Sequence, residues 1–288
     1  MANNSLAGTT VLVTGGAGGL GRAIAKGYLG AGANVAVCDI NAERLAATQA
    51  ELEAAAPGRV HSARADVTDE AAVEALFDGV VARFGRLDVL VNNAGMADTF
   101  QPVGTLTKAA WDRVLNLNLT GSFLAARAAV RAMEKNPPPA AASSSAPEQE
   151  QEQGQTGGGG GLIIQIGSTA SERGHESGLA YTVSKHGVAG LVKNTAGFYG
   201  PRGIYAVGLM LGAMIDTNIA EGMQSLGQDW NMEALSRTTS ASQPPEELVK
   251  NAVKLDDVAK YCVFLSDRSI AATANGSCIM FNKNSPRA

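Results

Sequence analysis

The sequence TVLVTGGAGGLG, residues 10–21, decides the fold of this chain. A short run of apolar and β-branched residues ends in a glycine-rich turn, and an amphipathic helical pattern through Ile24 and Tyr28 follows. Glycines allow positive φ in the turn and let a pyrophosphate approach the free N–H groups at the helix N-terminus. Strand, turn and helix in this order predict a dinucleotide-binding unit. The residues expected to contact the dinucleotide here are Gly15, Gly19, Leu20 and Gly21.

Six more apolar runs follow along the chain, and longer helical patterns separate them. The runs are Asn34–Cys38, Arg59–Ala63, Leu87–Val91, Leu162–Ile166, Gly203–Met210 and Ser277–Phe281. Strands that alternate with helices predict a parallel sheet, and right-handed crossovers place helices on both of its faces. We therefore expect an α/β protein with a single-domain Rossmann fold, built on a doubly wound, seven-stranded parallel sheet. Its ligands would bind at the carboxyl ends of the strands.

The composition excludes several classes of protein. Charged residues make up 17% of the 288 residues, the net charge is −4, and the basic residues are scattered singly, so no surface for nucleic acid is expected. The first residues lack the pattern of a signal peptide, and no apolar run is long enough to span a membrane, which predicts a cytoplasmic protein. Cys38, Cys262 and Cys278 stand alone without CxxC spacing, so we expect buried thiols and no metal site.

Residues 137–161 interrupt the alternation of strands and helices. The segment, PPPAAASSSAPEQEQEQGQTGGGGG, has no aliphatic side chain larger than that of alanine and cannot bury enough surface to offset its ordering entropy. We interpret it as a disordered surface insertion within one domain that spans residues 1–288. A linker between two domains is the alternative. A passive spacer is favoured over a segment that recruits a protein partner.

A second variable segment, about residues 213–254, is expected to form a lid over the substrate. Flexible methionines and a tryptophan are suited to line a pocket for an apolar substrate, and the alternative is that they pack on the core. These apolar residues are Met214, Met223, Leu226, Trp230, Met232 and Leu235.

Asp39 ends the second predicted strand, eighteen residues after Gly21. A carboxylate there accepts hydrogen bonds from the ribose hydroxyls of NAD and repels the 2′-phosphate of NADP. Neither Ile40 nor Asn41 supplies an arginine, so NAD is favoured over NADP. The alternative is that Asp39 caps the helix that starts near Ala42, although Asn41 is better placed for that cap.

Two more strand ends supply candidate contacts to the cofactor. Asp66 and Val67 end the third strand, and Asn92-Asn93-Ala94-Gly95 ends the fourth. Asp66 is suited to the adenine edge and equally to starting the helix Glu70–Phe84. The small Ala94 and Gly95 suggest close packing of the backbone on the cofactor, whereas Asn92 and Asn93 are also suited to satisfying loop backbone groups.

Tyr181 and Lys185 suggest acid–base chemistry, because residues four apart share one face of a helix. A free phenol has a pKa of about 10, and a neighbouring ammonium is expected to lower it. Ser168, at the end of a strand, can donate a hydrogen bond to a substrate carbonyl oxygen. Singly, these residues would be interpreted as a surface pair and a turn cap. Their combination with the glycine-rich turn indicates catalysis.

Together these motifs resemble those of the short-chain dehydrogenase/reductase family. The matching elements span nearly the whole chain apart from the insertion. They are TGGAGGLG at 14–21, Asp39, Asp66-Val67, NNAG at 92–95, Asn118 within LNLTG, Ser168, and Tyr181 with Lys185. The resemblance implies an NAD-dependent oxidoreductase that interconverts a secondary alcohol and a ketone on a small to medium, fairly apolar substrate. It also implies a homotetramer or homodimer formed through helices 111–133 and 181–199.

The resemblance assigns a role to each site residue. Tyr181 would exchange a proton with the substrate oxygen while a hydride passes between the substrate carbon and the nicotinamide. Ser168 would polarise the carbonyl, and Lys185 would hold the nicotinamide ribose. Asn118 would steady a water for proton relay, with a helix kink or a packing role as its alternative. Thr217 would contact the nicotinamide carboxamide.

Two loops depart from the pattern of the family. The loop 211–217, LGAMIDT, lacks the usual proline and is one residue longer before Thr217. The sequence 281–284, FNKN, stands where Val-Asp-Gly-Gly is usual. These departures motivate an alternative function, a catalytically weak nucleotide-binding regulator or scaffold.

Overall fold

Seven parallel strands form one sheet in the computed structural model, which describes residues 5–137, 159–219, 221–238 and 244–283. The strand order is β3-β2-β1-β4-β5-β6-β7. Every predicted apolar run forms one of these strands, with small shifts at the ends, so the predicted α/β fold is confirmed. The strands are β1 (Thr10–Thr14), β2 (Asn34–Asp39), β3 (Val60–Arg64), β4 (Val89–Asn92), β5 (Gly161–Ser168), β6 (Ile204–Leu211) and β7 (Cys278–Phe281).

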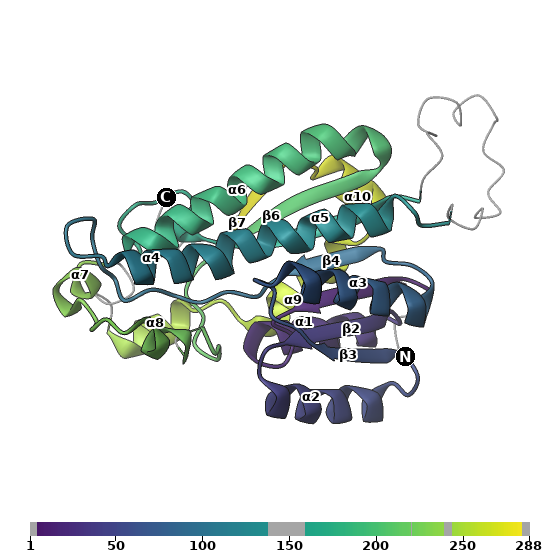
Figure 1. Cartoon of the computed structure of the whole chain (residues 1–288), viewed down its shortest axis with the longest axis horizontal. Coiled ribbons are helices and arrows are strands. Elements are labelled where there is room, and N and C mark those ends of the chain that lie inside the picture. Colours follow the sequence, from purple (N-terminus) through teal and green to yellow (C-terminus); the bar gives the residue numbers. More distant parts are fainter. Residues whose placement is uncertain (1–4, 138–158, 220, 239–243, 284–288) are drawn as a thin grey trace.

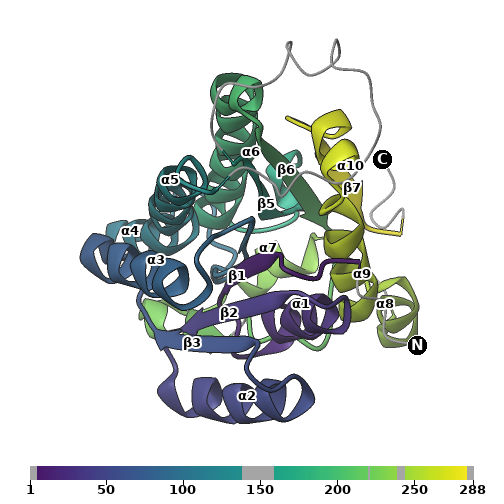
Figure 2. The ribbon, with the colours of Figure 1, turned by 90° about the vertical axis from the view of Figure 1, so that its right-hand side faces the viewer.

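Helices cover both faces of the sheet (Figures 1 and 2). Successive strand residues point to opposite faces, so Val11 and Val13 pack in one apolar cluster and Leu12 in another. The first cluster includes α1 (Gly19–Gly30), α2 (Ala42–Ala55) and α9 (Leu255–Leu265). The second includes α3 (Glu70–Phe84), α5 (Ser122–Met133) and α6 (Leu179–Tyr199). No helix in the described part of the chain is long and apolar enough to cross a membrane.

The strand order reverses next to β1. The chain adds β2 and β3 on one side of β1 and β4 to β7 on the other, so Val13 pairs with Val37 on one side and Val91 on the other. Because all strands are parallel, their carboxyl ends meet at one edge, here called the C-terminal edge. Their amino ends meet at the opposite, N-terminal edge. Ligands of such sheets bind where the loops diverge at the C-terminal edge.

The predicted helix 111–133 begins earlier and contains a π-helical turn. It consists of α4 (Lys108–Leu115), the π-helical turn η1 (Asn116–Gly121) and α5 in direct succession. A π-turn inserts an extra residue into the helix and changes the direction of the side chains on it. Asn118, on this turn, is buried.

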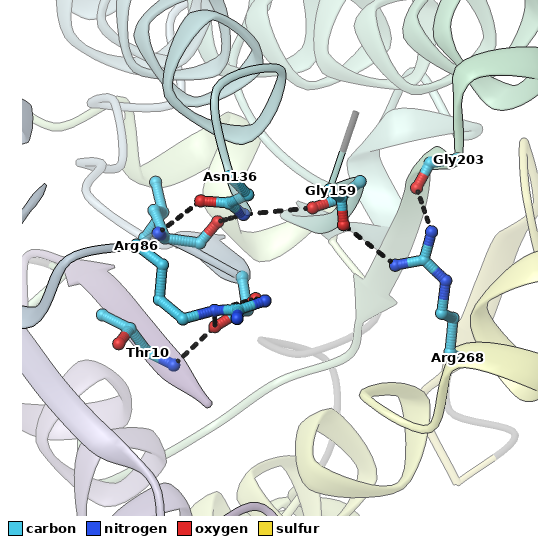
Figure 3. Close-up of polar contacts among 9 residues, drawn as sticks. Thr10, Arg86, Asn136, Gly159, Gly203 and Arg268 are labelled. Carbon is cyan, nitrogen blue, oxygen red and sulfur yellow. Dashed lines mark hydrogen bonds and ion pairs between the residues drawn. The ribbon is translucent and has the colours of Figure 1, made fainter. Parts of the chain in front are cut away.

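Polar side chains tie neighbouring strands together at the N-terminal edge (Figure 3). The buried amide of Asn136, just after α5, accepts a hydrogen bond from the Leu87 N–H at 3.0 Å. It donates to the carbonyl oxygens of Leu87 and Gly160 at 2.6 and 3.2 Å. The Asp88 carboxylate accepts a hydrogen bond from the Thr10 N–H at 2.9 Å. These bonds join the starts of β1, β4 and β5.

The insertion is shorter than the sequence suggested. The Arg268 guanidinium donates to the carbonyl oxygens of Gly159 and Gly203 at 3.3 and 3.5 Å (Figure 3), and Gly161 is the first residue of β5. Residues 159–161 therefore belong to the folded part, and the predicted boundary at 161 is wrong. The rest of the predicted insertion, residues 138–158, lies outside the described residues.

The segment between β6 and α9 packs on the loop after β4. It contains the 3₁₀ helix η5 (Glu221–Leu226), α7 (Met232–Ser236) and α8 (Pro245–Asn251), of which α7 and α8 lie at the same end of the molecule as α4 (Figure 1). The Asn231 N–H donates to the Thr99 carbonyl oxygen at 3.0 Å, and the Gln101 side chain donates to the Asp229 carbonyl oxygen at 2.8 Å. The described part of this segment thus has a defined place above the C-terminal edge.

The C-terminal loop has a backbone conformation that explains why glycine is usual at one position of the family pattern. Lys283 has a φ of 51°, a left-handed conformation that favours glycine, and it occupies a position where glycine is usual. Phe281 stacks on Tyr261 with ring centroids 5.3 Å apart. The adjacent Cys278, in β7, is only partly buried, which corrects the expectation for that thiol; Cys38 and Cys262 are buried as expected.

Candidate active site

A cavity of about 1100 Å³ lies at the C-terminal edge of the sheet. Binding pockets for drug-sized ligands measure roughly 300–1,000 Å³, so this cavity is at least as large as a site for one such ligand. No group of residues in the described ranges is suited to hold a metal ion. The predicted site residues that line the cavity are Gly15, Gly19, Leu20, Asp39, Asp66, Val67, Asn93, Ala94, Gly95, Tyr181, Lys185 and Thr217.

The glycine-rich turn after β1 fits a pyrophosphate. Gly15 and Gly19 have φ values of 60° and 44°, which other residues rarely adopt. A Cβ on Gly21 would lie 2.1 Å from the Gly15 carbonyl oxygen, so Gly21 lets the helix approach the turn even though it does not line the cavity. Helix α1 starts after Gly18 without any side-chain cap, which leaves its first N–H groups free for an anion.

Asp39 is not the cap of α2. Asn41 caps that helix, because its side chain accepts a hydrogen bond from the Arg44 N–H at 2.9 Å. The Asp39 carboxylate accepts hydrogen bonds from the N–H groups of Asn41 at 2.9 Å and Ala17 at 3.3 Å. This carboxylate therefore joins the end of β2 to the glycine-rich turn and forms part of the cavity wall.

The other strand ends are fixed by short-range hydrogen bonds. The Asn93 side chain donates to the carbonyl oxygens of Thr14 and Gly15 at 2.9 and 3.1 Å and so supports the glycine-rich turn from β4. The Asp66 carboxylate accepts hydrogen bonds from the N–H and hydroxyl of Thr68, at 2.9 and 2.7 Å. Asp69 is the N-cap of α3, and Asp66 supports the turn just before it, so the alternative that Asp66 with Thr68 and Asp69 starts this helix agrees with the structure, and a contact of Asp66 with the adenine edge stays a prediction.

Tyr181 and Lys185 lie together in the first turns of α6. Both are buried, and the Lys185 ammonium lies 5.5 Å from the centroid of the Tyr181 ring. Lys185 donates a hydrogen bond to the Ile166 carbonyl oxygen at 2.8 Å, which ties α6 to the end of β5. Ser168 ends β5 and accepts a hydrogen bond from the Ala170 N–H at 3.2 Å, and its side chain lies close enough to the Tyr181 hydroxyl to act on the pKa of Tyr181. Ser168 is therefore both a turn cap and a neighbour of the Tyr181 hydroxyl.

Burial controls the charge states of this pair. It raises the pKa of Tyr181 to about 12; the hydrogen bond with Ser168 acts in the opposite direction, and the negative charge of Asp98 raises this pKa further. Burial also lowers the pKa of Lys185 to about 8. The expectation that Lys185 lowers the pKa of Tyr181 is wrong for this structure, because the cost of burying the phenolate exceeds what its neighbours offset.

Asn118 is held firmly but does not line the cavity. Its side chain accepts a hydrogen bond from the Met96 N–H and donates to the Met96 carbonyl oxygen, both at 2.9 Å, and it also donates to the Ser184 hydroxyl at 3.1 Å. These bonds connect the π-turn to the loop after β4 and to α6. They support a packing role, and a role in proton relay stays a prediction.

The expected lid residues contribute less to the cavity than the sequence suggested. Of the six apolar residues named in the segment, Met214 alone lines the cavity. Met223 and Leu226 are buried away from the cavity lining, whereas Trp230 and Met232 are 43% and 64% exposed. Thr217 does line the cavity, and a Cβ on Gly19 would lie 3.1 Å from the Thr217 Cα. The longer loop after β6 therefore still brings Thr217 to the glycine-rich turn.

The sequence interpretation missed an arginine at the nucleotide end. Arg44 lines the cavity, and its side chain forms an ion pair with Glu221 of η5 at 2.5 Å. Its buried Nε atom has no hydrogen-bond partner. The signal was present in part, because Arg44 lies one helical turn after the cap Asn41. Nothing in the sequence pairs it with Glu221, 177 residues away.

Two protein families match the chain. Residues 9–145 match the family described as short chain dehydrogenase, and residues 149–282 match one described as enoyl-(acyl carrier protein) reductase. Both matches are consistent with the cavity, because the first range contains the glycine-rich turn and the second contains Ser168, Tyr181 and Lys185.

Related proteins cover nearly the full length of this one. The short chain dehydrogenase/reductase dpchG of Colletotrichum higginsianum is 41% identical, over 96% of this chain and 93% of its own. The 3beta-hydroxysteroid dehydrogenase 2 of Eggerthella lenta is 33% identical, over 85% and 86%. The crystal structure of a short chain dehydrogenase from Burkholderia cenocepacia in complex with NADP is similar with a TM-score of 0.73 and 30% identity, over 97% and 98%. The chain belongs to the short-chain dehydrogenase/reductase family and is an oxidoreductase of that family.

Proposed function

We propose that the protein interconverts a secondary alcohol and a ketone with NAD(H), and that Tyr181 is its acid–base residue. One observation carries the proposal. Tyr181, whose pKa the Ser168 side chain acts to lower, lines the same cavity as the glycine-rich turn. A proton donor and a dinucleotide-binding turn therefore face one space, as a reaction that moves a proton and a hydride together requires.

Tyr181 would transfer the proton. With its pKa raised to about 12, the phenol is protonated at neutral pH and can donate to a substrate carbonyl oxygen. Ser168 would donate a second hydrogen bond to the same oxygen and stabilise the negative charge that develops there. A nicotinamide cofactor, when bound, supplies the hydride or accepts it. In the direction of alcohol oxidation, Tyr181 must first lose its proton.

Lys185 would hold the cofactor ribose. Its amine is buried, and within the described part of the chain it donates only to the Ile166 carbonyl oxygen. An ammonium has three N–H donors, so two remain for ribose hydroxyls. A buried cation with unused donors on a cavity wall fits a polar ligand.

NAD would be preferred over NADP because of Asp39 and Glu221. The Asp39 carboxylate lines the cavity and would repel a 2′-phosphate. Arg44 is the cation nearest along the chain that could offset this repulsion, but Glu221 already neutralises it. The sequence prediction of NAD rested on the absence of an arginine next to Asp39. The ion pair between Arg44 and Glu221 is the more important reason.

The substrate would be fairly apolar. Met96, Ile166 and Met214 line the cavity and offer apolar contacts. A related protein is named a 3beta-hydroxysteroid dehydrogenase, which acts on an apolar alicyclic alcohol. We therefore favour cyclic ketones and their alcohols of small to medium size.

A homo-oligomer remains part of the proposal. Phe123 on α5 and Phe198 on α6 are 44% and 70% exposed, on the two helices through which the family resemblance implies assembly. Sedimentation velocity would test this, with a dimer or tetramer as the expected species.

A substrate panel tests the proposed function. NADH and NADPH would be compared with a set of cyclic and linear ketones, and NAD⁺ and NADP⁺ with the matching alcohols. We expect turnover with at least one cyclic substrate and a higher kcat/KM with NADH. Tight NADH binding without turnover on the whole panel would favour the nucleotide-binding regulator instead.

A further inference from the structure

Asp98 is a buried carboxylate that the proposed mechanism does not use. It lies three residues after Gly95, in the loop that follows β4, and is 1% exposed. No Lys or Arg of the described residues forms an ion pair with it within 4.0 Å. Burying a carboxylate is costly unless hydrogen bonds satisfy it. Its position next to the catalytic helix therefore requires a physical reason.

The carboxylate caps the catalytic helix from another part of the chain. Oδ1 accepts a hydrogen bond from the Gly178 N–H at 3.0 Å, and Oδ2 accepts one from the Tyr181 N–H at 2.9 Å. The Ser177 hydroxyl also donates to Oδ1, at 3.4 Å. Gly178 is the N-cap of α6 and has no side chain to bind the free N–H groups of the first turn. Asp98 supplies the missing cap, eighty-three residues before Tyr181 in the sequence.

The same carboxylate orders the loop that contacts the lid segment. Oδ1 accepts a hydrogen bond from the Phe100 N–H at 3.1 Å, and Phe100 has a left-handed φ of 60°. The Phe100 ring stacks on Trp230 with centroids 6.0 Å apart. Asp98 thus connects the helix that carries Tyr181 to the loop whose Phe100 contacts Trp230.

The charge of Asp98 lies next to the main chain of Tyr181, because Asp98 Oδ2 is 2.9 Å from the Tyr181 N atom. It raises the pKa of Tyr181, in addition to the larger effect of burial. The pKa of Asp98 is itself raised by burial, while hydrogen bonds from Tyr181, Phe100, Gly178 and Ser177 act in the opposite direction. The other titratable groups around this turn are Lys185 on the same helix and Glu176 in the preceding loop, whose carboxylate lies 3.4 Å from His175.

We propose that Asp98 is a positioning residue for the reaction: it fixes the first turn of α6, and its negative charge adds to burial in favouring the protonated form of Tyr181 that carbonyl reduction uses. The inference rests on the proposed role of Tyr181 as proton donor. It assigns to a loop residue a function that none of the family motifs in the sequence includes.

Asp98→Asn tests the effect of the charge, because the amide keeps the size and one acceptor. Removing the negative charge makes the Tyr181 phenolate easier to form. The high-pH limb of ketone reduction, which needs the protonated phenol, should therefore move to lower pH by about one unit. The rising limb of alcohol oxidation, which needs the phenolate, should move in the same direction. We also expect kcat for reduction to fall about tenfold at neutral pH, because the amide nitrogen cannot accept one of the two main-chain hydrogen bonds that hold the helix turn.

Asp69→Asn is the matched control. Asp69 caps α3 in the same manner, with hydrogen bonds from the N–H groups of Ala71 and Ala72 at 2.9 and 3.2 Å, but it is exposed, and α3 carries none of the proposed catalytic residues. Asp69→Asn should lower the melting temperature by about as much as Asp98→Asn does, and it should leave the pH profiles of reduction and oxidation unchanged. Profiles of Asp98→Asn that match those of wild type, with stability alone reduced, would overturn the proposal.

Gly178→Ala displaces the Asp98 carboxylate and keeps its charge. This variant replaces Asp98→Asn if that variant does not fold. Gly178 has an ordinary φ of −72°, so alanine adds no backbone strain, but its Cβ would lie 2.5 Å from Asp98 Oδ1. The carboxylate must then move away from the turn. We expect kcat to fall about tenfold with NADH affinity unchanged. Unchanged kcat would contradict the proposal.

Hydrogen exchange separates this inference from the proposed function. Amide exchange of the peptide that covers residues 178–183 does not depend on turnover. In Asp98→Ala it should become about tenfold faster or more, because the Tyr181 N–H loses its acceptor. If exchange is faster in Asp98→Ala but the wild-type protein turns over no substrate, the role of Asp98 as a cap is supported and the proposed function is wrong. If the wild-type protein is active but exchange is unchanged in Asp98→Ala, the proposed cap is wrong and the proposed function stands.

Discussion

Two sets of polar side chains at opposite edges of the sheet differ in how fully they are hydrogen-bonded. At the N-terminal edge, Asn136 and Asp88 form several hydrogen bonds each, and all of their partners are main-chain groups or Arg86 (Figure 3). At the C-terminal edge, the buried Lys185 donates a single hydrogen bond within the described part of the chain, and Arg44 has a buried Nε without a partner.

The difference separates structural polar groups from functional ones. A buried polar group costs free energy unless it is hydrogen-bonded, so saturated groups such as Asn136 are explained by the fold itself. Groups with unused donors on a cavity wall are explained by a ligand. We therefore expect changes at the C-terminal edge to alter activity and changes at the N-terminal edge to alter stability.

The largest effect is expected for Tyr181→Phe. Phenylalanine keeps the ring in its buried place and removes only the hydroxyl, so turnover should fall about 10³-fold. NADH affinity, measured by fluorescence titration, should stay within twofold, and the melting temperature should change little. Substantial activity in Tyr181→Phe would contradict the proposal that the C-terminal edge holds the active site.

The second effect concerns the opposite edge. Asn136→Ala leaves the N–H and carbonyl groups of Leu87 and the carbonyl oxygen of Gly160 without their side-chain partner, so the free energy of unfolding should fall by about 2 kcal/mol. Urea unfolding would measure it. The folded variant should keep the kcat of wild type, because the site lies at the other edge. A reduced kcat in fully folded protein would show that the edges are coupled.

A smaller effect is expected for Glu221→Gln, which frees Arg44 to bind a 2′-phosphate. The kcat/KM with NADPH should rise about fivefold while that with NADH stays nearly constant, since an exposed ion pair is a weak interaction. The double variant Arg44→Ala with Glu221→Gln is the matched control and should lose the gain. An equal gain in both variants would show that Arg44 does not contact the phosphate.

The smallest effect is expected when residues 138–158 are deleted and Pro137 is joined to Gly159. The two ends are close, because a Cβ on Gly159 would lie 2.7 Å from the Pro137 carbonyl oxygen. Both ends belong to the N-terminal edge, where Asn136 and Arg268 fix the neighbouring backbone. The shortened protein should keep kcat, KM and melting temperature close to those of wild type. A clear loss of activity would give the insertion a function.

The sequence predicted the nucleotide end better than the lid segment, for a physical reason. Glycines with positive φ, a strand-end carboxylate and a Tyr–Lys pair four residues apart are local features, so Gly15, Asp39 and Tyr181 with Lys185 could be placed without knowing the fold. The lid residues depend on tertiary packing, and composition alone did not show that Met232 is exposed while Met223 is buried.

Long-range partners were beyond any local pattern. The bonds from Asp98 to α6 and from Arg44 to Glu221 join residues 80 or more positions apart, and neither belongs to a recognisable motif. The raised pKa of Tyr181 has the same origin, because burial is a property of the packed structure. The sequence identified the chemical groups, and the structure determined their charge states and supports.

Transfer of a labelled hydride tests the central claim most directly. The protein would be incubated with [4,4-²H₂]NADH and a ketone from the substrate panel, and the alcohol would be analysed by mass spectrometry. We predict one deuterium on the carbinol carbon of the wild-type product, and about 10³-fold less labelled product from Tyr181→Phe at equal NADH occupancy. Alcohol without the label, or equal labelling by the two proteins, would contradict the account.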